Sequence, residues 1–251
     1  MKQSLFFMVI VSFFSVILQN AAASEENYFT HTELQIHADY ERKPFINDDI
    51  WTLTFEHVSE WKYGDNFFFL DIESMPPFRM QADTMYFEYS PRLSLDKIFN
   101  HKIFPFKLIS EVYLAGQYND GDKDFIDTVR LYGISFDFGF QPNFGFSQLS
   151  FYLRDQETQD QSWQLTFVWG QPFKIAFMSL NFSGFLDYWE DDKKKILITE
   201  PQLRFQFDTF LDKGSFMSQS SIGVEVEITH NFFGEDQGWE VNPTIFFAMP
   251  L

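Results

Sequence analysis

The chain has 251 residues, with 18 basic and 36 acidic side chains, a net charge of −18 at pH 7 and no cysteine. The acidic balance argues against a nucleic acid partner, because binding to phosphates needs clusters of lysine and arginine. Without cysteine there are no disulfides, so packing or backbone pairing must hold the fold together.

The first 23 residues have the pattern of a secretory signal peptide. Lys2 gives a positive start, residues 5–18 are an apolar run, and Ala21 and Ala23 form an A-x-A cleavage site. An N-terminal membrane anchor is the alternative, but the apolar run is shorter than the ~20 residues that a spanning helix needs. We therefore expect an exported mature chain that begins at Ser24 and forms one domain, residues 24–251.

Twelve later segments alternate apolar and polar residues with a period of two, which predicts β-strands with one apolar and one polar face. The expected strands are 32–41, 50–59, 66–73, 84–97, 107–118, 127–139, 144–154, 162–170, 175–189, 197–207, 221–231 and 239–251. Polar connectors such as 119–122, 155–160, 190–195 and 234–236 separate them.

The apolar faces of these segments are dominated by aromatic residues, in a chain that contains 35 phenylalanines. This number is excessive for one soluble core, whereas lipid-facing strands can accommodate it. A soluble periplasmic sandwich or lipocalin-like barrel would show the same alternation and remains the alternative. The pattern predicts an all-β fold: a 12-stranded antiparallel transmembrane β-barrel of a Gram-negative outer membrane, with both termini on the periplasmic side.

The most distinctive stretch is 87–97, which reads F-E-Y-S-P-R-L-S-L-D-K. Together with L-N-F-S-G-F-L-D-Y-W at 180–189, it resembles the Tsx-like family of nucleoside-specific channel-forming outer-membrane proteins, as a divergent branch. The similarity covers about residues 66–251. It implies a monomeric barrel with a narrow pore that passes nucleosides, and members of that family also serve as phage receptors. The chain departs from the family by ending in Leu251 instead of Phe.

The polar faces would line the lumen of such a barrel. We expect an acidic set opposed by arginines, and inner aromatic rings that could stack on planar bases. The predicted lining is Phe67, Phe69, Asp71, Glu73, Glu88, Arg92, Tyr113, Asp137, Arg154, Phe185, Asp187, Glu200 and Arg204, with Tyr152, Glu225 and Glu227 on the same wall. The alternatives are a salt-bridge network that only braces the barrel and aromatic rings that only fill a narrow end.

Within this set, Phe67, Phe69 and Phe185 are the predicted stacking wall. Asp71, Glu88, Asp187 and Arg92 are the predicted polar contacts. The resulting hypothesis is a channel for nucleosides or similar small aromatic solutes, which binds them weakly so that they can leave. A non-conducting surface barrel that acts as a receptor, for example for phage, or as a scaffold is the alternative function.

An enzyme is the third possibility, and the sequence offers little for it. Of five histidines only His37 is expected to point inward, with no serine and acid beside it. No H-E-x-x-H, P-loop or dinucleotide motif is present, so we expect no catalytic residues, no metal and no cofactor.

Overall fold

The computed structural model describes residues 28–40, 42, 49–74, 84–124, 126–139, 145–191, 194–211, 215–232 and 238–251. The predicted signal peptide and the connector at 234–236 lie outside these ranges, as do Glu41 at the end of the first predicted strand and residues 192–193 of the connector at 190–195.

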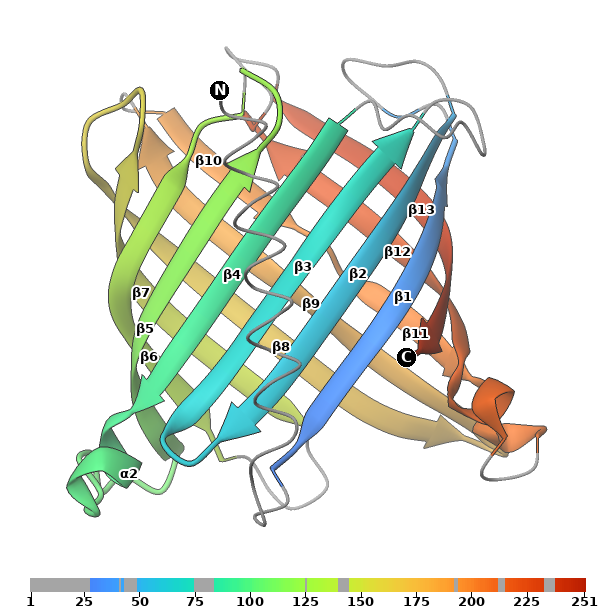
Figure 1. The fold of residues 1–251 in the computed structure, drawn as a ribbon, viewed down its shortest axis with the longest axis horizontal. Helices are drawn as coiled ribbons and strands as arrows, with labels where there is room; N and C mark the ends of the chain where they lie inside the picture. The colour runs from blue at the N-terminus through green and yellow to red at the C-terminus, as the bar shows by residue number, and fades with distance from the viewer. Residues whose placement is uncertain are drawn as a thin grey trace.

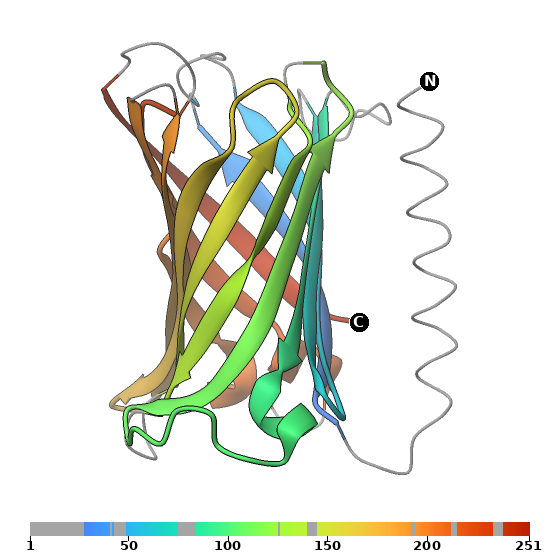
Figure 2. The same cartoon turned by 90° about the vertical axis from the view of Figure 1, so that its left-hand side faces the viewer.

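The described chain is almost entirely one antiparallel sheet that closes on itself, because β1 pairs with both β2 and β13 (Figures 1 and 2). The strands are β1 (Thr30–Asp39), β2 (Ile50–Trp61), β3 (Gly64–Ser74), β4 (Thr84–Ser94), β5 (Ile109–Gly121), β6 (Val129–Phe138), β7 (Phe146–Gln156), β8 (Ser162–Ile175), β9 (Met178–Asp191), β10 (Lys194–Thr199), β11 (Gln202–Gln206), β12 (Ser221–His230) and β13 (Trp239–Pro250).

β10 and β11 are two halves of one barrel strand, since both pair with β9 on one side and β12 on the other. Pro201 separates them because proline has no N–H to donate to the ladder. The pairing still continues across the break, where Glu200 N–H donates to Phe185 O at 3.2 Å and Val226 N–H donates to Pro201 O at 3.0 Å. The barrel therefore has twelve strands, which confirms the predicted 12-stranded antiparallel β-barrel.

Gly184 allows this break to pack closely. A Cβ added there would lie 2.5 Å from the carbonyl oxygen of Glu200 and 3.0 Å from the Cα of Pro201. The first distance is shorter than real Cβ atoms show and the second is tight, so the neighbouring strands can approach this closely because residue 184 has no side chain.

The described helices are short: α2 (Leu95–Phe99), η1 (Phe207–Thr209) and η2 (Phe216–Gln219). Within the ranges that the structure covers, no helix combines the length and apolar character needed to cross a membrane. α2 corrects the fourth predicted strand, which was expected to reach residue 97 and instead ends at Ser94. The Ser94 hydroxyl accepts from Lys97 N–H at 3.0 Å and so caps the helix, a local bond that competes with continued pairing.

The two faces of the sheet follow the predicted alternation. Register places Glu56 opposite Phe69 and Phe69 opposite Glu88, all on the predicted inner wall. Arg204 on β11 reaches Glu33 on β1 at 2.6 Å, past both β12 and β13, which only the concave side of a closed sheet allows.

The outer face is apolar and exposed. Among its large hydrophobic residues that are more than a third exposed are Leu53, Leu93, Leu114, Tyr132, Ile134, Phe151, Leu153, Trp163, Phe182, Leu203, Ile222, Val224, Val241 and Ile245. Phe87 lies on this face as predicted, but it is only 6% exposed because it packs with Phe68 in an aromatic group. Arg130 is exposed at the second position of β6, at the barrel end opposite α2, as its charge requires.

The inner wall is less uniformly polar than the sequence predicts. Ala115, Val129, Leu131 and Tyr152, on β5 to β7, form a buried apolar cluster on the lumen side. These side chains cover one another, so this part of the inner wall is apolar and has little contact with water.

Cysteine substitution tests the register. In lipid, Glu225→Cys should react with a membrane-impermeant thiol reagent, whereas Val224→Cys, at an outer position that is 46% exposed, should be protected by the acyl chains. The opposite pattern in a folded barrel would mean that the strand is shifted by one residue, since a one-residue slip exchanges the two faces.

Candidate functional site

The predicted stacking and acidic residues come from opposite walls of one lumen. In the ring of twelve strands, β3 and β9 are six positions apart in either direction. Phe69 and Asp71 therefore face the lumen from one side, and Phe185 and Asp187 face it from the other. Glu88 lies next to Phe69, on β4.

The middle of the lumen is acidic. Thr54 donates to Asp71 at 2.5 Å, Thr166 donates to Asp187 at 2.5 Å, and Ser90 donates to Glu88 at 3.3 Å. None of these three carboxylates takes part in the ion pairs found among the described residues. Hydroxyl groups therefore orient three acidic side chains that face the lumen and take no part in these ion pairs.

Glu200 and Glu225 extend this acidic region. Glu225 accepts a hydrogen bond from Gln202 and lies 3.7 Å from Nδ1 of His37. Glu200 lies between β10 and β11, where its N–H donates to Phe185 O at 3.2 Å. His37 is inward as expected; it lies 2.8 Å from the Oε1 of Gln35, and no Ser–His–acid arrangement forms around it in the described chain.

Aromatic rings border the acidic region on the β3–β4 side. Phe67 and Phe69 have ring centroids 6.1 Å apart, and Phe69 lies 5.8 Å from Tyr86. Tyr86 was not among the predicted lining residues, although its position two residues before Glu88 puts it on the inner face. The hydroxyl of Tyr86 also donates to Glu88, at 3.5 Å.

Three of the four arginines that line the lumen within the described ranges are held by neighbouring side chains. Arg92 forms ion pairs with Asp65 at 2.7 Å and Asp137 at 2.6 Å, and its guanidinium lies 4.1 Å from the ring centroid of Tyr113. We interpret this network, next to α2, as a brace between β3, β4 and β6.

Arg154 and Arg204 each contact a polar or charged side chain and an aromatic ring. Arg154 donates to Gln164 at 2.6 Å and lies 4.5 Å from the Trp189 ring centroid. Arg204 pairs with Glu33 at 2.6 Å and lies 5.0 Å from the Phe246 ring centroid. Trp189 and Phe246 were missed, although both continue the inward parity of their strands.

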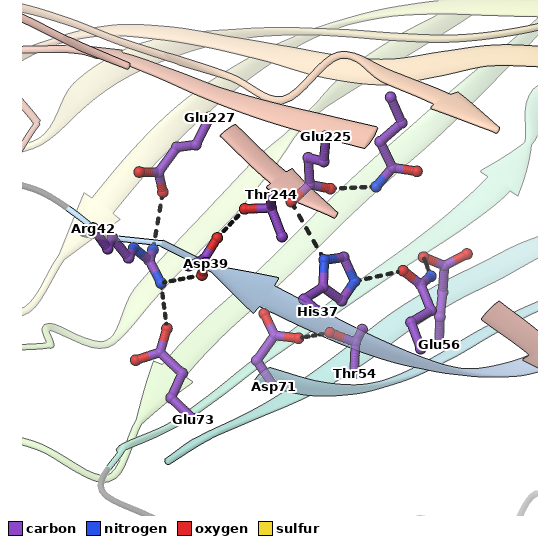
Figure 3. Close-up of polar contacts among 12 residues, drawn as sticks. His37, Asp39, Arg42, Thr54, Glu56, Asp71, Glu73, Glu225, Glu227 and Thr244 are labelled. Carbon is purple, nitrogen blue, oxygen red and sulfur yellow. Dashed lines mark hydrogen bonds and ion pairs between the residues drawn. The ribbon is translucent and has the colours of Figure 1, made fainter. Parts of the chain in front are cut away.

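Arg42 is the fourth lumen arginine and comes from the connection after β1 (Figure 3). Its guanidinium donates to Glu73 on β3 at 2.9 Å and to Glu227 on β12 at 3.0 Å, and it lies 3.8 Å from Asp39. Burial disfavours its charged form, but the carboxylates outweigh burial and raise the pKa of Arg42 above its usual value. Nothing in the sequence predicts this contact, because connectors lack the alternation that assigns each strand residue to one face of the sheet.

No group of three or more histidine, aspartate and glutamate side chains in the described ranges could hold a metal ion. The lumen carboxylates are spread over several walls. The described groups can attract, orient and hydrogen-bond a solute.

Removing Arg92 should destabilise the barrel, because Asp65 and Asp137 would lose their shared counter-charge. Arg92→Met should lower the free energy of unfolding by about 3–5 kcal/mol, measured by urea unfolding in lipid vesicles. Adding Asp65→Asn and Asp137→Asn to the same chain should recover part of the loss. Equal stability of Arg92→Met and the parent protein would contradict a bracing role.

Two solved structures of the KdgM porin and one of the Acinetobacter baumannii outer membrane protein Omp33 are similar to this chain. The KdgM porin shares 7% identity, with 88% of this chain and 98% of that chain covered and a TM-score of 0.48. The KdgM porin in complex with disordered oligogalacturonate shares 8% identity, with 87% of this chain and 97% of that chain covered and a TM-score of 0.46. Acinetobacter baumannii Omp33 shares 10% identity, with 88% of this chain and 97% of that chain covered and a TM-score of 0.34. No curated protein matches the sequence.

These comparisons do not support the expected assignment to the Tsx-like nucleoside channels. The model of a different family matches residues 31–249, which span every strand of the barrel except the outermost residues of β1 and β13. The chain therefore belongs to the family described as "Domain of unknown function (DUF5020)".

Proposed function

We propose that this protein is an outer-membrane channel that lets small neutral or cationic solutes diffuse through its lumen. A closed barrel with an apolar, exposed outer face satisfies its backbone hydrogen bonds in lipid without open edges. Export through a cleaved signal peptide, residues 1–23, would bring it to this membrane.

The observation that carries the proposal is a group of acidic side chains in the lumen that take no part in the ion pairs of the described residues. Asp71, Glu88 and Asp187 project from three strands and take their hydrogen bonds from hydroxyl groups. Fixed charges of one sign in a narrow pore select permeant solutes by their charge. Cations would be concentrated there, and anions such as nucleotides would be repelled.

Nucleosides are the solute class that we propose within this group. A nucleoside is uncharged, has a planar base that aromatic rings can stack on, and carries donors that carboxylates can accept. Phe69 and Tyr86 supply rings beside Glu88, and Phe185 supplies one from the opposite wall. Stacking contributes about 1–3 kcal/mol per base, enough for selection without slow release.

A non-conducting barrel, used as a receptor or scaffold, is the second candidate function. It is favoured by inner-wall side chains with almost no exposed surface, such as Leu131 at 0%, Phe246 at 1% and Gln164 at 1%. A lumen filled by its own side chains would not conduct.

Liposome swelling separates these functions. Vesicles carrying the purified barrel should admit adenosine faster than a sugar of similar size, and AMP slowest. Phe185→Ala should remove the advantage of adenosine over the sugar, whereas Phe182→Ala, on the outer wall, should keep it. Equal rates for adenosine and the sugar would reduce the protein to a general pore, and no uptake of either would favour the receptor or scaffold.

Arg42 should limit cation preference at the lumen mouth, since it neutralises Glu73 and Glu227 there. In a planar bilayer, Arg42→Ala should raise the conductance. In a salt gradient it should shift the reversal potential toward the value of an ideally cation-selective pore. Arg42→Lys should shift it less, because the charge remains. Arg130→Ala, which removes an exposed outer arginine, is the matched control and should leave the reversal potential unchanged. An unchanged potential in Arg42→Ala would show that this residue does not set selectivity.

A further inference from the structure

We propose that the connection between β4 and β5, residues 95–108, is a preformed binding surface for anionic phospholipid headgroups. We call it the β4–β5 foot. The proposal rests on the membrane location given under Proposed function but does not require that the barrel conduct solutes.

The β4–β5 foot exposes apolar and basic side chains together. Its exposed hydrophobic residues are Ile98 at 45%, Phe99 at 64%, Ile103 at 36%, Phe104 at 39%, Phe106 at 64% and Leu108 at 52%. The exposed basic residues are Lys97, His101, Lys102 and Lys107. Three lysines within eleven residues are a marked departure in a chain whose net charge is −18.

The only acidic residue of the foot is turned inward. Asp96 is 9% exposed, and its carboxylate accepts from Ile103 N–H at 2.9 Å and from the Lys102 ammonium at 3.0 Å. Its carbonyl oxygen accepts from His101 N–H at 3.1 Å. These bonds fix the connection around Asp96, so no carboxylate within residues 95–108 is left on the exposed surface.

The lysines keep charge available to a ligand. Lys97 lies 3.5 Å from Glu111 but its side chain is 41% exposed, and the side chain of Lys102 is 57% exposed despite its bond to Asp96. Exposed ion pairs of this kind are weak, so a phosphodiester can compete for the ammonium groups.

The foot is continuous with the lipid-facing wall. Phe104 makes an edge contact with Phe136, at 5.8 Å between ring centroids, and Phe136 shares the outer face with Val112 and Leu149. Gly139 N–H donates to Leu108 O at 3.0 Å. The foot leaves the barrel at the end where β1 begins (Figures 1 and 2).

Two properties of the β4–β5 foot identify its ligand: its aromatic rings continue the apolar outer wall, and its lysines are positively charged. Rings that extend an acyl-facing wall lie at the boundary between acyl chains and headgroups, where Phe and Leu insert and Lys reaches anionic lipid. The attraction per lysine near such a surface is large enough to change an equilibrium about fivefold. A soluble acidic partner would match the lysines but would not explain rings aligned with the outer wall.

Hydrogen exchange of the full-length barrel in vesicles tests this binding. Amides of residues 95–108 should exchange more slowly in vesicles containing phosphatidylglycerol than in vesicles of phosphatidylcholine alone. Lys107→Gln, which leaves the Lys102–Asp96 contact in place, should reduce this difference about fivefold. Lys174→Gln, an exposed lysine near the end of β8, is the matched control and should leave it unchanged.

Equal exchange in the two lipids would overturn the proposal, and so would a lipid effect that Lys107→Gln does not reduce. Phe99→Ser with Phe106→Ser should abolish the slowing without changing the exchange of the barrel strands, which shows that the variant is folded. Solute uptake is measured on the same vesicles, so a failed channel hypothesis and a failed lipid site give different results.

Discussion

Pairing of β1 with β13 is the interaction on which the rest of the structure depends. The two strands are held in register from Glu33 with Pro250 to Asp39 with Thr244, and this seam turns a sheet with two edges into one with none. In lipid an unpaired strand edge would leave backbone groups without partners, at a cost of several kcal/mol for each group. Closure also creates the concave face on which Arg204 can meet Glu33.

Charged side chains are unevenly distributed over the inner wall of the barrel. The four lumen arginines lie toward the two ends or against the walls, where carboxylates or aromatic rings hold them. The centre keeps carboxylates that are oriented by threonine and serine. A barrel that needed only internal bracing would pair its arginines with these central acids as well. Ion-paired carboxylates next to acidic side chains that take no part in an ion pair among the described residues distinguish this lumen from a uniform salt-bridge network.

The alternation of residue types was sufficient to predict the strand number, the two faces and most of the inner wall. It works because the side-chain period of a strand is two, whatever its neighbours are. The alternation along one strand does not predict which side chains of different strands contact one another. The alternation does not predict the ion pairs of Arg92 with Asp65 and Asp137, nor that of Arg42 with Glu227. Each of them depends on how the closed barrel brings separate strands together.

Local chemistry explains the other differences. Ser94 ended a predicted strand early by capping α2, and ring packing covered Phe87 on the outer wall. Trp189 and Phe246 had the correct parity, but aromatic residues were expected mainly on the lipid side. Their burial inside reflects the guanidinium groups that lie over them, which need a partner surface in a confined lumen.

The close approach at Gly184 links two positions on different strands. A Cβ at residue 184 would collide with the carbonyl oxygen of Glu200, so the present path of β10 and β11 adds to the demand for glycine that its φ of +155° already makes. Replacing Pro201 would restore a backbone donor and allow that path to change. Substitutions at 184 and 201 should therefore be non-additive, and in the evolution of this family the two positions should change together or not at all.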